Sequence, residues 1–72
     1  MPYVAIRVTD ESVTVDQKAV LIEETTEMLQ RVLGKDPATT HVVIDEVNTD
    51  NWGVAGVSVT TLRSDAEASQ PL

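Results

Sequence analysis

Pro2 is the residue of this chain whose type and position together allow proton-transfer chemistry. If Met1 is removed, the nitrogen of Pro2 becomes a secondary amine at the chain terminus, an ionisable group that no other position offers. The pKa of an α-amino group is about 7.7–8.0 in water, and desolvation lowers the pKa of a cation. A buried terminal amine is then partly neutral at working pH, as a general base must be. The structural alternative is that proline is simply tolerated at the first residue of a strand.

Three other residues have side chains suited to holding a small anionic or flat substrate. His41, when protonated, attracts a carboxylate near neutral pH, although a histidine at a strand end is also satisfied by backbone groups. Trp52 forms either the wall of a pocket or an anchor in a subunit interface, where aromatic residues are enriched. Arg7 binds either a substrate anion or an acid of a neighbouring subunit, and the many acids of the chain favour the second. Asp45 and Glu46 are no acid/base pair, because adjacent strand residues point to opposite faces.

Two strands and one long helix are predicted to position these residues. Residues 2–9 alternate, and their aliphatic face should lie under the helix. Thr14 and Gln17 fit a capping box, so the helix is predicted over residues 15–33. Its buried stripe should contain Leu21, Ile22, Thr25, Met28, Leu29 and Val32.

Residues 41–47 form the second predicted strand, and their aliphatic centre indicates burial on both faces. A strand, a helix of nearly twenty residues and a second strand make a βαβ unit with parallel strands and a right-handed crossover. The fold class is therefore α/β, or α+β once a short C-terminal hairpin is included. Residues 56–62 are predicted as a terminal strand or hairpin arm that reaches a neighbour. We assign residues 1–63 to one domain and residues 64–72 to a flexible, acidic tail that frays.

Size and charge restrict the function further. A chain of 72 residues builds only a small core, and without cysteine and with one histidine it has neither disulfides nor a metal site to stabilise it. We therefore expect a homo-oligomer. The net charge of −7 argues against binding nucleic acid, and no segment resembles a signal peptide or a membrane span. A cytoplasmic protein is the simplest interpretation.

Several short motifs occur in one order along the chain. They are Met-Pro-Tyr-Val-Ala-Ile at the start, Asp16-Gln17-Lys18, Asp36-Pro37, Val42-Val43-Ile44-Asp45-Glu46 and Asn51-Trp52-Gly53. Over residues 2–62 this ordered set resembles the short 4-oxalocrotonate tautomerases of the tautomerase superfamily. The resemblance implies that Pro2 is the general base and then the general acid, that no cofactor is used, and that the βαβ subunits form a homohexamer, a trimer of dimers.

The chain departs from this family at the residues that bind substrate. In the best-known members, one arginine before the helix and another at the start of the second strand hold a dicarboxylate. Here residues 10–13 contain two acids and no arginine, and His41 takes the second place, so 4-oxalocrotonate itself is in doubt as a substrate. Trp52 replaces a phenylalanine of the family's pocket. Val54 stands where related dehalogenases carry a water-activating glutamate, which disfavours hydrolytic dehalogenation.

The leading hypothesis is an isomerase that interconverts the enol and keto forms of a small anionic 2-oxo acid. Pro2 would move the proton, His41 and backbone N–H groups would offset the substrate's charge, and Trp52 would supply an apolar lid. The rival is a non-catalytic or weakly catalytic oligomeric module with the same fold. A third hypothesis, a hydratase that uses Pro2 as an acid, needs a water activator that the sequence does not reveal.

Overall fold

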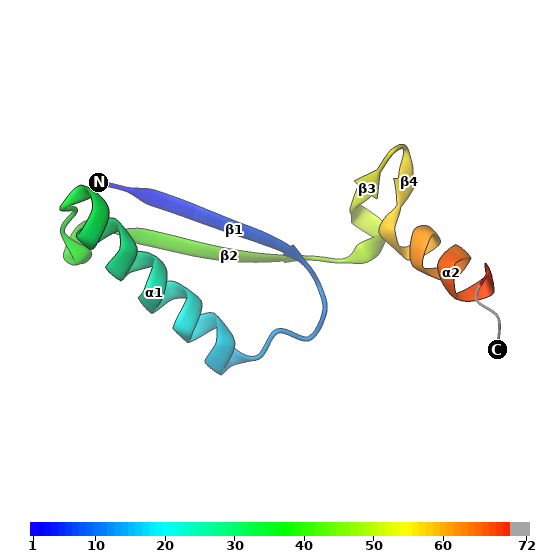
Figure 1. The fold of residues 1–72 in the computed structure, drawn as a ribbon, viewed down its shortest axis with the longest axis horizontal. Coiled ribbons are helices and arrows are strands. Elements are labelled where there is room, and N and C mark those ends of the chain that lie inside the picture. The colour runs from blue at the N-terminus through cyan, green and yellow to red at the C-terminus, as the bar shows by residue number, and fades with distance from the viewer. Residues whose placement is uncertain (70–72) are drawn as a thin grey trace.

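The computed structural model describes residues 1–69. It shows a βαβ unit followed by a C-terminal segment, residues 49–69, which we call the arm (Figure 1). Short 3₁₀ turns, η1 and η2, precede and follow the second strand. In chain order the elements are β1 (Tyr3–Thr9), α1 (Val15–Leu33), η1 (Pro37–Thr39), β2 (His41–Val47), η2 (Thr49–Asn51), β3 (Gly53–Val54), β4 (Val57–Ser58) and α2 (Val59–Ser69). No helix within residues 1–69 combines the length and the apolar character needed to cross a membrane.

The first helix, α1, has the boundaries that its capping residues predict. Gln17 donates its backbone N–H to the Thr14 hydroxyl (3.1 Å), and the Thr14 N–H donates to the Gln17 side chain (2.9 Å). Two otherwise unpaired donors are thus satisfied where the helix begins. At the other end Gly34 takes a left-handed conformation (φ 67°), and its N–H donates to the Gln30 carbonyl (2.9 Å). The predicted capping box and helix range are confirmed.

The strands β1 and β2 are parallel, with Tyr3 opposite His41, Arg7 opposite Asp45 and Thr9 opposite Val47. Exposure alternates along both strands, so one face of this two-stranded sheet is half-buried and the other is open. Figure 1 shows α1 on one side of the pair. The prediction that β2 is buried on both faces is wrong for the single chain: Val43, on the open face, is 45% exposed. One helix covers only one face of a sheet.

An ion pair ties α1 to the sheet. The Lys18 ammonium group contacts the Glu46 carboxylate, and the two side chains are 32% and 23% exposed. Lys18 lies in the first turns of α1 and Glu46 lies on the covered face of β2. Water screens this pair less than a surface pair, so it helps to fix α1 against β2.

The single chain has no fully buried residue among those whose burial is described, 1–65. The predicted helix stripe is correspondingly open, with Ile22 and Met28 each 42% exposed and Val32 66% exposed. The radius of gyration is 16.8 Å, whereas a compact chain of this length has about 11 Å. The prediction of a buried stripe is therefore wrong for the subunit alone, because one helix on two strands has too little surface to enclose it.

The arm consists of the turn η2, a short hairpin and a helix. The strands β3 and β4 pair in an antiparallel way around Ala55 (φ 54°) and Gly56 (φ 82°), so both turn residues have the positive φ of a tight primed turn. The Ser58 hydroxyl then accepts the Thr61 N–H (3.2 Å), as an N-cap does, and α2 begins.

This arm corrects part of the sequence prediction. The hairpin is present, but residues 59–62 are helical rather than a terminal strand. The fraying of the predicted tail stays a prediction, but its residues 64–69 belong to this helix. The Ser58 cap and the alanines at positions 66 and 68 explain this, because both favour a helix. Residues 70–72 of the predicted tail lie outside the described residues, and the division of the chain at residue 63 stays a prediction.

Candidate functional site

Pro2 and His41 lie together at one end of the β1–β2 sheet. The His41 backbone N–H donates to the Pro2 carbonyl at 3.0 Å, directly before the register pair of Tyr3 and His41. Pro2 is half-buried, and the His41 side chain is exposed on the open face. In the structure Met1 precedes Pro2 and is 88% exposed, so the surrounding chain leaves the Met1–Pro2 bond accessible. While that bond is intact, the Pro2 nitrogen is an amide and has no basicity.

Arg7 and Trp52 gather at the opposite end of the sheet, where they share a shallow hollow. The guanidinium Nε of Arg7 donates to the Asp45 carboxylate at 3.1 Å across the two strands. Arg7 thus has an acidic partner within its own chain, while its binding of a substrate anion or of an acid of a neighbouring subunit stays a prediction. The residues that line this hollow, which we call the Trp52 hollow, are Arg7, Asp45, Val47, Asn51, Trp52 and Gly53.

The two groups of candidate residues are far apart within one chain. Arg7 follows Pro2 by five positions of extended chain, which span about 17 Å at about 3.3 Å per residue. Trp52 follows η2, beyond the far end of β2, so it is at least as far from Pro2 as Arg7 is. The single subunit therefore brings Pro2 and His41 together, and Arg7 and Trp52 together, but does not unite the four.

Hydrogen bonds within the arm fix the position of Trp52. The Trp52 carbonyl accepts the Val59 N–H at 2.7 Å, which links η2 to the start of α2. The Thr60 hydroxyl lies 2.6 Å from the Thr49 hydroxyl and donates to the Asp50 carboxylate at 2.5 Å. These contacts hold η2 and α2 as one unit, so Trp52 is carried by the arm and not only by β2.

A third ion pair joins the arm to the loop between β1 and α1. The Arg63 guanidinium contacts the Glu11 carboxylate, which also accepts a hydrogen bond from the Thr9 hydroxyl (2.9 Å). The hydrogen bond from Arg63, then that from Thr9 and the positive charge of Arg63, hold the pKa of Glu11 below its ordinary value of 4.5. The charge of Arg63 is therefore already neutralised by an acid of the loop.

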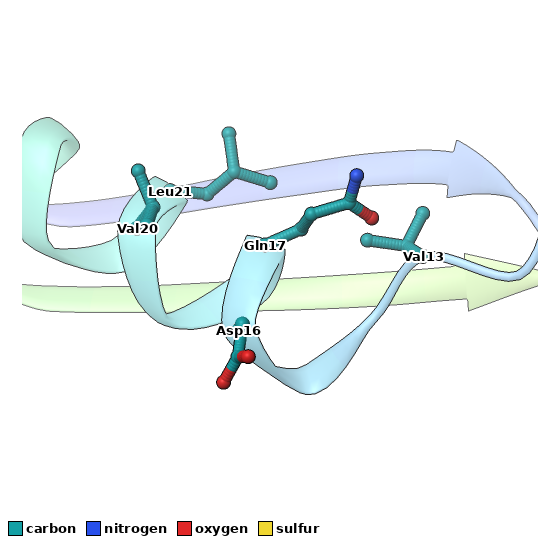
Figure 2. Close-up of a pocket in the computed structure, with 5 residues that line it drawn as sticks. All are labelled: Val13, Asp16, Gln17, Val20 and Leu21. Atoms are coloured by element: carbon teal, nitrogen blue, oxygen red, sulfur yellow. The ribbon is translucent and has the colours of Figure 1, made fainter.

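Another hollow lies at the start of α1 and contains none of the candidate residues. Figure 2 shows Val13, Gln17 and Leu21 on one side of the first helical turns, while the Asp16 carboxylate points the opposite way. Its lining is mainly apolar, with Val20 50% and Leu21 37% exposed. Its lining contains no cation, and its one carboxylate, Asp16, points away from the other lining side chains, so it offers no group that would bind an anionic substrate.

Sequence reasoning missed the residues that accompany Arg7, namely Asp45 and Asn51. The signal for Asp45 was available, because Arg7 and Asp45 are each the fifth residue of a strand and parallel strands in register place them side by side. Asn51 reaches the hollow through the turn η2, which no periodicity indicates. Residues 1–69 contain no cluster of three or more His, Asp or Glu side chains arranged to hold a metal ion.

Comparison with known proteins identifies the fold and the family. Residues 2–62 match the family model described as "Tautomerase enzyme". The chain is 56% identical over 66 residues to the probable tautomerase K2 of Dickeya dadantii. The matched residues cover 92% of this chain and 98% of that relative. It is 39% identical over 62 residues to the 2-hydroxymuconate tautomerase of Pseudomonas putida, covering 86% of this chain and 97% of that one.

Solved structures agree with these relatives. The crystal structure of DmpI from Helicobacter pylori superposes with a TM-score of 0.81 at 38% identity, covering 88% of this chain and 97% of that chain. The βαβ unit with a C-terminal hairpin, predicted from the sequence, is thus the fold of these neighbours as well. The chain belongs to the 4-oxalocrotonate tautomerase family and is an isomerase of the keto–enol tautomerase type.

Proposed function

We propose that this isomerase interconverts the enol and keto forms of a small anionic 2-oxo acid, with Pro2 as the proton-transferring group after Met1 has been removed. The observation that carries the proposal is the placement of Pro2 at the end of an ordered parallel sheet. Its carbonyl is fixed by the His41 N–H (3.0 Å), so the terminal nitrogen sits on a rigid strand rather than on a loose end. General bases work best when they are held in place.

The proton moves in two balanced steps. The neutral Pro2 nitrogen takes the proton from the enol hydroxyl, the O–H electrons form the carbonyl, and the charge spreads to a carbon of the substrate. The protonated nitrogen then returns the proton to that carbon, which regenerates the neutral amine. The exposed imidazole of His41, when protonated, offsets the charge of the substrate carboxylate. None of these steps consumes a cofactor.

The proposed site is completed by a second copy of the chain. Pro2 and Trp52 are too far apart in one subunit to touch one small substrate, so Trp52 must come from a neighbouring copy if it forms the apolar wall. The subunit also has an open sheet face and no fully buried residue within positions 1–65, as expected of a protein that completes its core by association. We propose a homo-oligomer, and specifically a hexamer built as a trimer of dimers.

Replacing Pro2 tests the proposal. Pro2→Ala should lower kcat/KM for the conversion of phenylenolpyruvate to its keto form by about 10²–10⁴-fold, the usual contribution of a positioned general acid or base. Pro37→Ala is the matched control, since it removes a proline from the exposed turn η1. Intact-mass measurement should show loss of Met1 from the active protein. Equal rates for Pro2→Ala and wild type would refute the role of Pro2.

The rival hypothesis of a non-catalytic module is not favoured, because the relatives that match this chain over most of its length are named as tautomerases. A hydratase would need a water-activating side chain near Pro2. On the paired strand, the residue bonded to Pro2 is His41, which the proposal already uses to offset the substrate's charge.

A further inference from the structure

The Trp52 hollow combines an aromatic ring, an amide, a guanidinium and a carboxylate in one small surface. Trp52 and Asn51 come from η2 and its end, whereas Arg7 and Asp45 come from neighbouring strands. A surface of this composition suits the flat or apolar part of a small molecule, with a few polar atoms to orient it. Its net charge decides which molecules it accepts.

The charge of the hollow is neutral because Asp45 faces Arg7. The Arg7 Nε lies 3.1 Å from the Asp45 Oδ2, and the two residues are direct partners in the strand register. In the single subunit the side chains are 66% and 51% exposed, so the pair contributes little to the stability of the isolated chain. Its main effect is therefore on charge: Arg7 is already paired when a ligand arrives.

The other cations of the chain do not supply a replacement. The sequence contains five basic side chains, Arg7, Lys18, Arg31, Lys35 and Arg63. Lys18 is paired with Glu46, and Arg63 with Glu11. Arg31 lies in the last turn of α1 and Lys35 follows it, and neither lines the Trp52 hollow. Within residues 1–65, a carboxylate that entered the hollow would thus meet one guanidinium that is already neutralised and an acid beside it.

We propose that Asp45 determines the substrate class: it makes the Trp52 hollow neutral, so the site accepts monocarboxylates with an uncharged tail and discriminates against dicarboxylates. The inference rests on the proposed function, in which the single carboxylate is held at the Pro2 and His41 end and the tail lies on Trp52 of another copy. An unpaired Arg7 would bind a second carboxylate, whereas Asp45 repels it. Asp45 acts through Arg7 and is a specificity-determining residue, not a catalytic one.

Binding can be measured without turnover, because Trp52 is the only tryptophan of the chain. Its fluorescence should report a ligand that enters the hollow. Hexanoate and adipate are suitable unreactive probes, since they have equal chain length and differ by one carboxylate. We expect the wild-type protein to bind hexanoate more tightly than adipate. Asp45→Asn should strengthen adipate binding about tenfold, as expected for one new charge-assisted contact, and leave hexanoate binding nearly unchanged.

Two further variants separate a local effect from a general one. Glu23→Gln removes the same charge from an exposed position on α1 outside the hollow, and it should leave the ratio of the two affinities at the wild-type value. Adding Arg7→Met to Asp45→Asn should abolish the gain for adipate, because the unpaired guanidinium is then absent. Circular dichroism should show all the variants folded, since the substituted side chains are exposed.

Turnover provides the second readout. Asp45→Asn should raise kcat/KM for 2-hydroxymuconate relative to phenylenolpyruvate by about tenfold. Equal shifts in Asp45→Asn and Glu23→Gln, or wild-type protein that binds adipate as tightly as hexanoate, would overturn the inference while leaving the proposed function intact. Conversely, no turnover of any enol by wild-type protein, together with the expected fluorescence results, would refute the proposed function and leave Asp45 only as the residue that sets the ligand preference of the Trp52 hollow.

Discussion

The two ends of the β1–β2 sheet differ in what they offer to a substrate. At the Pro2 end, a backbone hydrogen bond fixes the proposed base next to an exposed histidine. At the other end, an aromatic side chain lies among charges that are already paired, Arg7 with Asp45 and, on the adjoining loop, Glu11 with Arg63. One end is suited to moving a proton and the other to recognising a neutral surface.

Under the proposed function, this difference means that one subunit contributes two half-sites. About 17 Å of strand separates Pro2 from Arg7, so neither half-site completes the other within the chain. In this proposal oligomerisation serves both stability and function, because the copy that covers the open face would also bring its Trp52 to the neighbour's Pro2. Variants at each end should consequently change different parameters.

The largest effect in the recognition half-site is expected from removing the aromatic ring. Trp52→Ala should lower kcat/KM for phenylenolpyruvate about tenfold, mainly through KM, because it removes apolar contact area rather than the base. Trp52→Phe should stay within a fewfold of wild type. Steady-state kinetics of both variants check this. A drop confined to kcat would instead place Trp52 at the reacting atoms and remove the contrast between the two ends.

A smaller effect is expected from the ion pair that fixes α1 to β2. Lys18→Met should reduce the free energy of unfolding by about 1 kcal/mol, since Glu46 is left partly buried without its partner. Urea unfolding at fixed protein concentration measures the change. In the double variant Lys18→Met/Glu46→Gln most of the loss should be recovered. Kinetic parameters at the two half-sites should change little, and a tenfold loss of activity would show that they are coupled through α1.

The smallest effect concerns the pair between the arm and the β1–α1 loop. Folding lowers the pKa of Glu11 from its ordinary value of 4.5. The ionised Glu11 therefore stabilises the folded protein at pH values above 4.5, and this stabilisation is lost as the pH falls through the lowered pKa. In Glu11→Gln the free energy of unfolding should therefore decrease slightly less steeply as the pH falls below about 4.5. Its dependence on pH above neutrality should not change. Thermal unfolding from pH 3 to 7 checks this. An unaltered profile would show that the pair with Arg63 does not persist in solution.

The sequence was sufficient for the local structure of the βαβ unit. Thr14, Gln17 and Gly34 determine where α1 begins and ends through hydrogen bonds to near neighbours, and such bonds follow from residue type and spacing. Hydrophobic periodicity also identified both strands and the covered face of β1. It overestimated burial of Ile22 and Val32, because periodicity shows which side is apolar and not whether anything in the same chain covers it.

The candidate site was only partly predictable. Pro2, His41 and Trp52 were identified from residue type and from resemblance, yet their distribution over two ends depends on the parallel register. For Arg7 the sequence left a substrate anion and an acid of a neighbouring subunit as alternatives, and neither included its Asp45 partner in the same chain. The helix α2 depends on the Ser58 cap inside a segment rich in β-branched residues, where propensity alone favours a strand.

The central claim is that each active site joins Pro2 of one copy to Trp52 of another, and mixing two variants tests it most directly. Pro2→Ala and Trp52→Ala are unfolded together, refolded at equal amounts and compared with each variant refolded alone. If the half-sites come from different copies, about one quarter of the sites in a random mixture contain both native residues, and activity should rise to about a quarter of wild type. Activity equal to the average of the two separate variants would contradict the account.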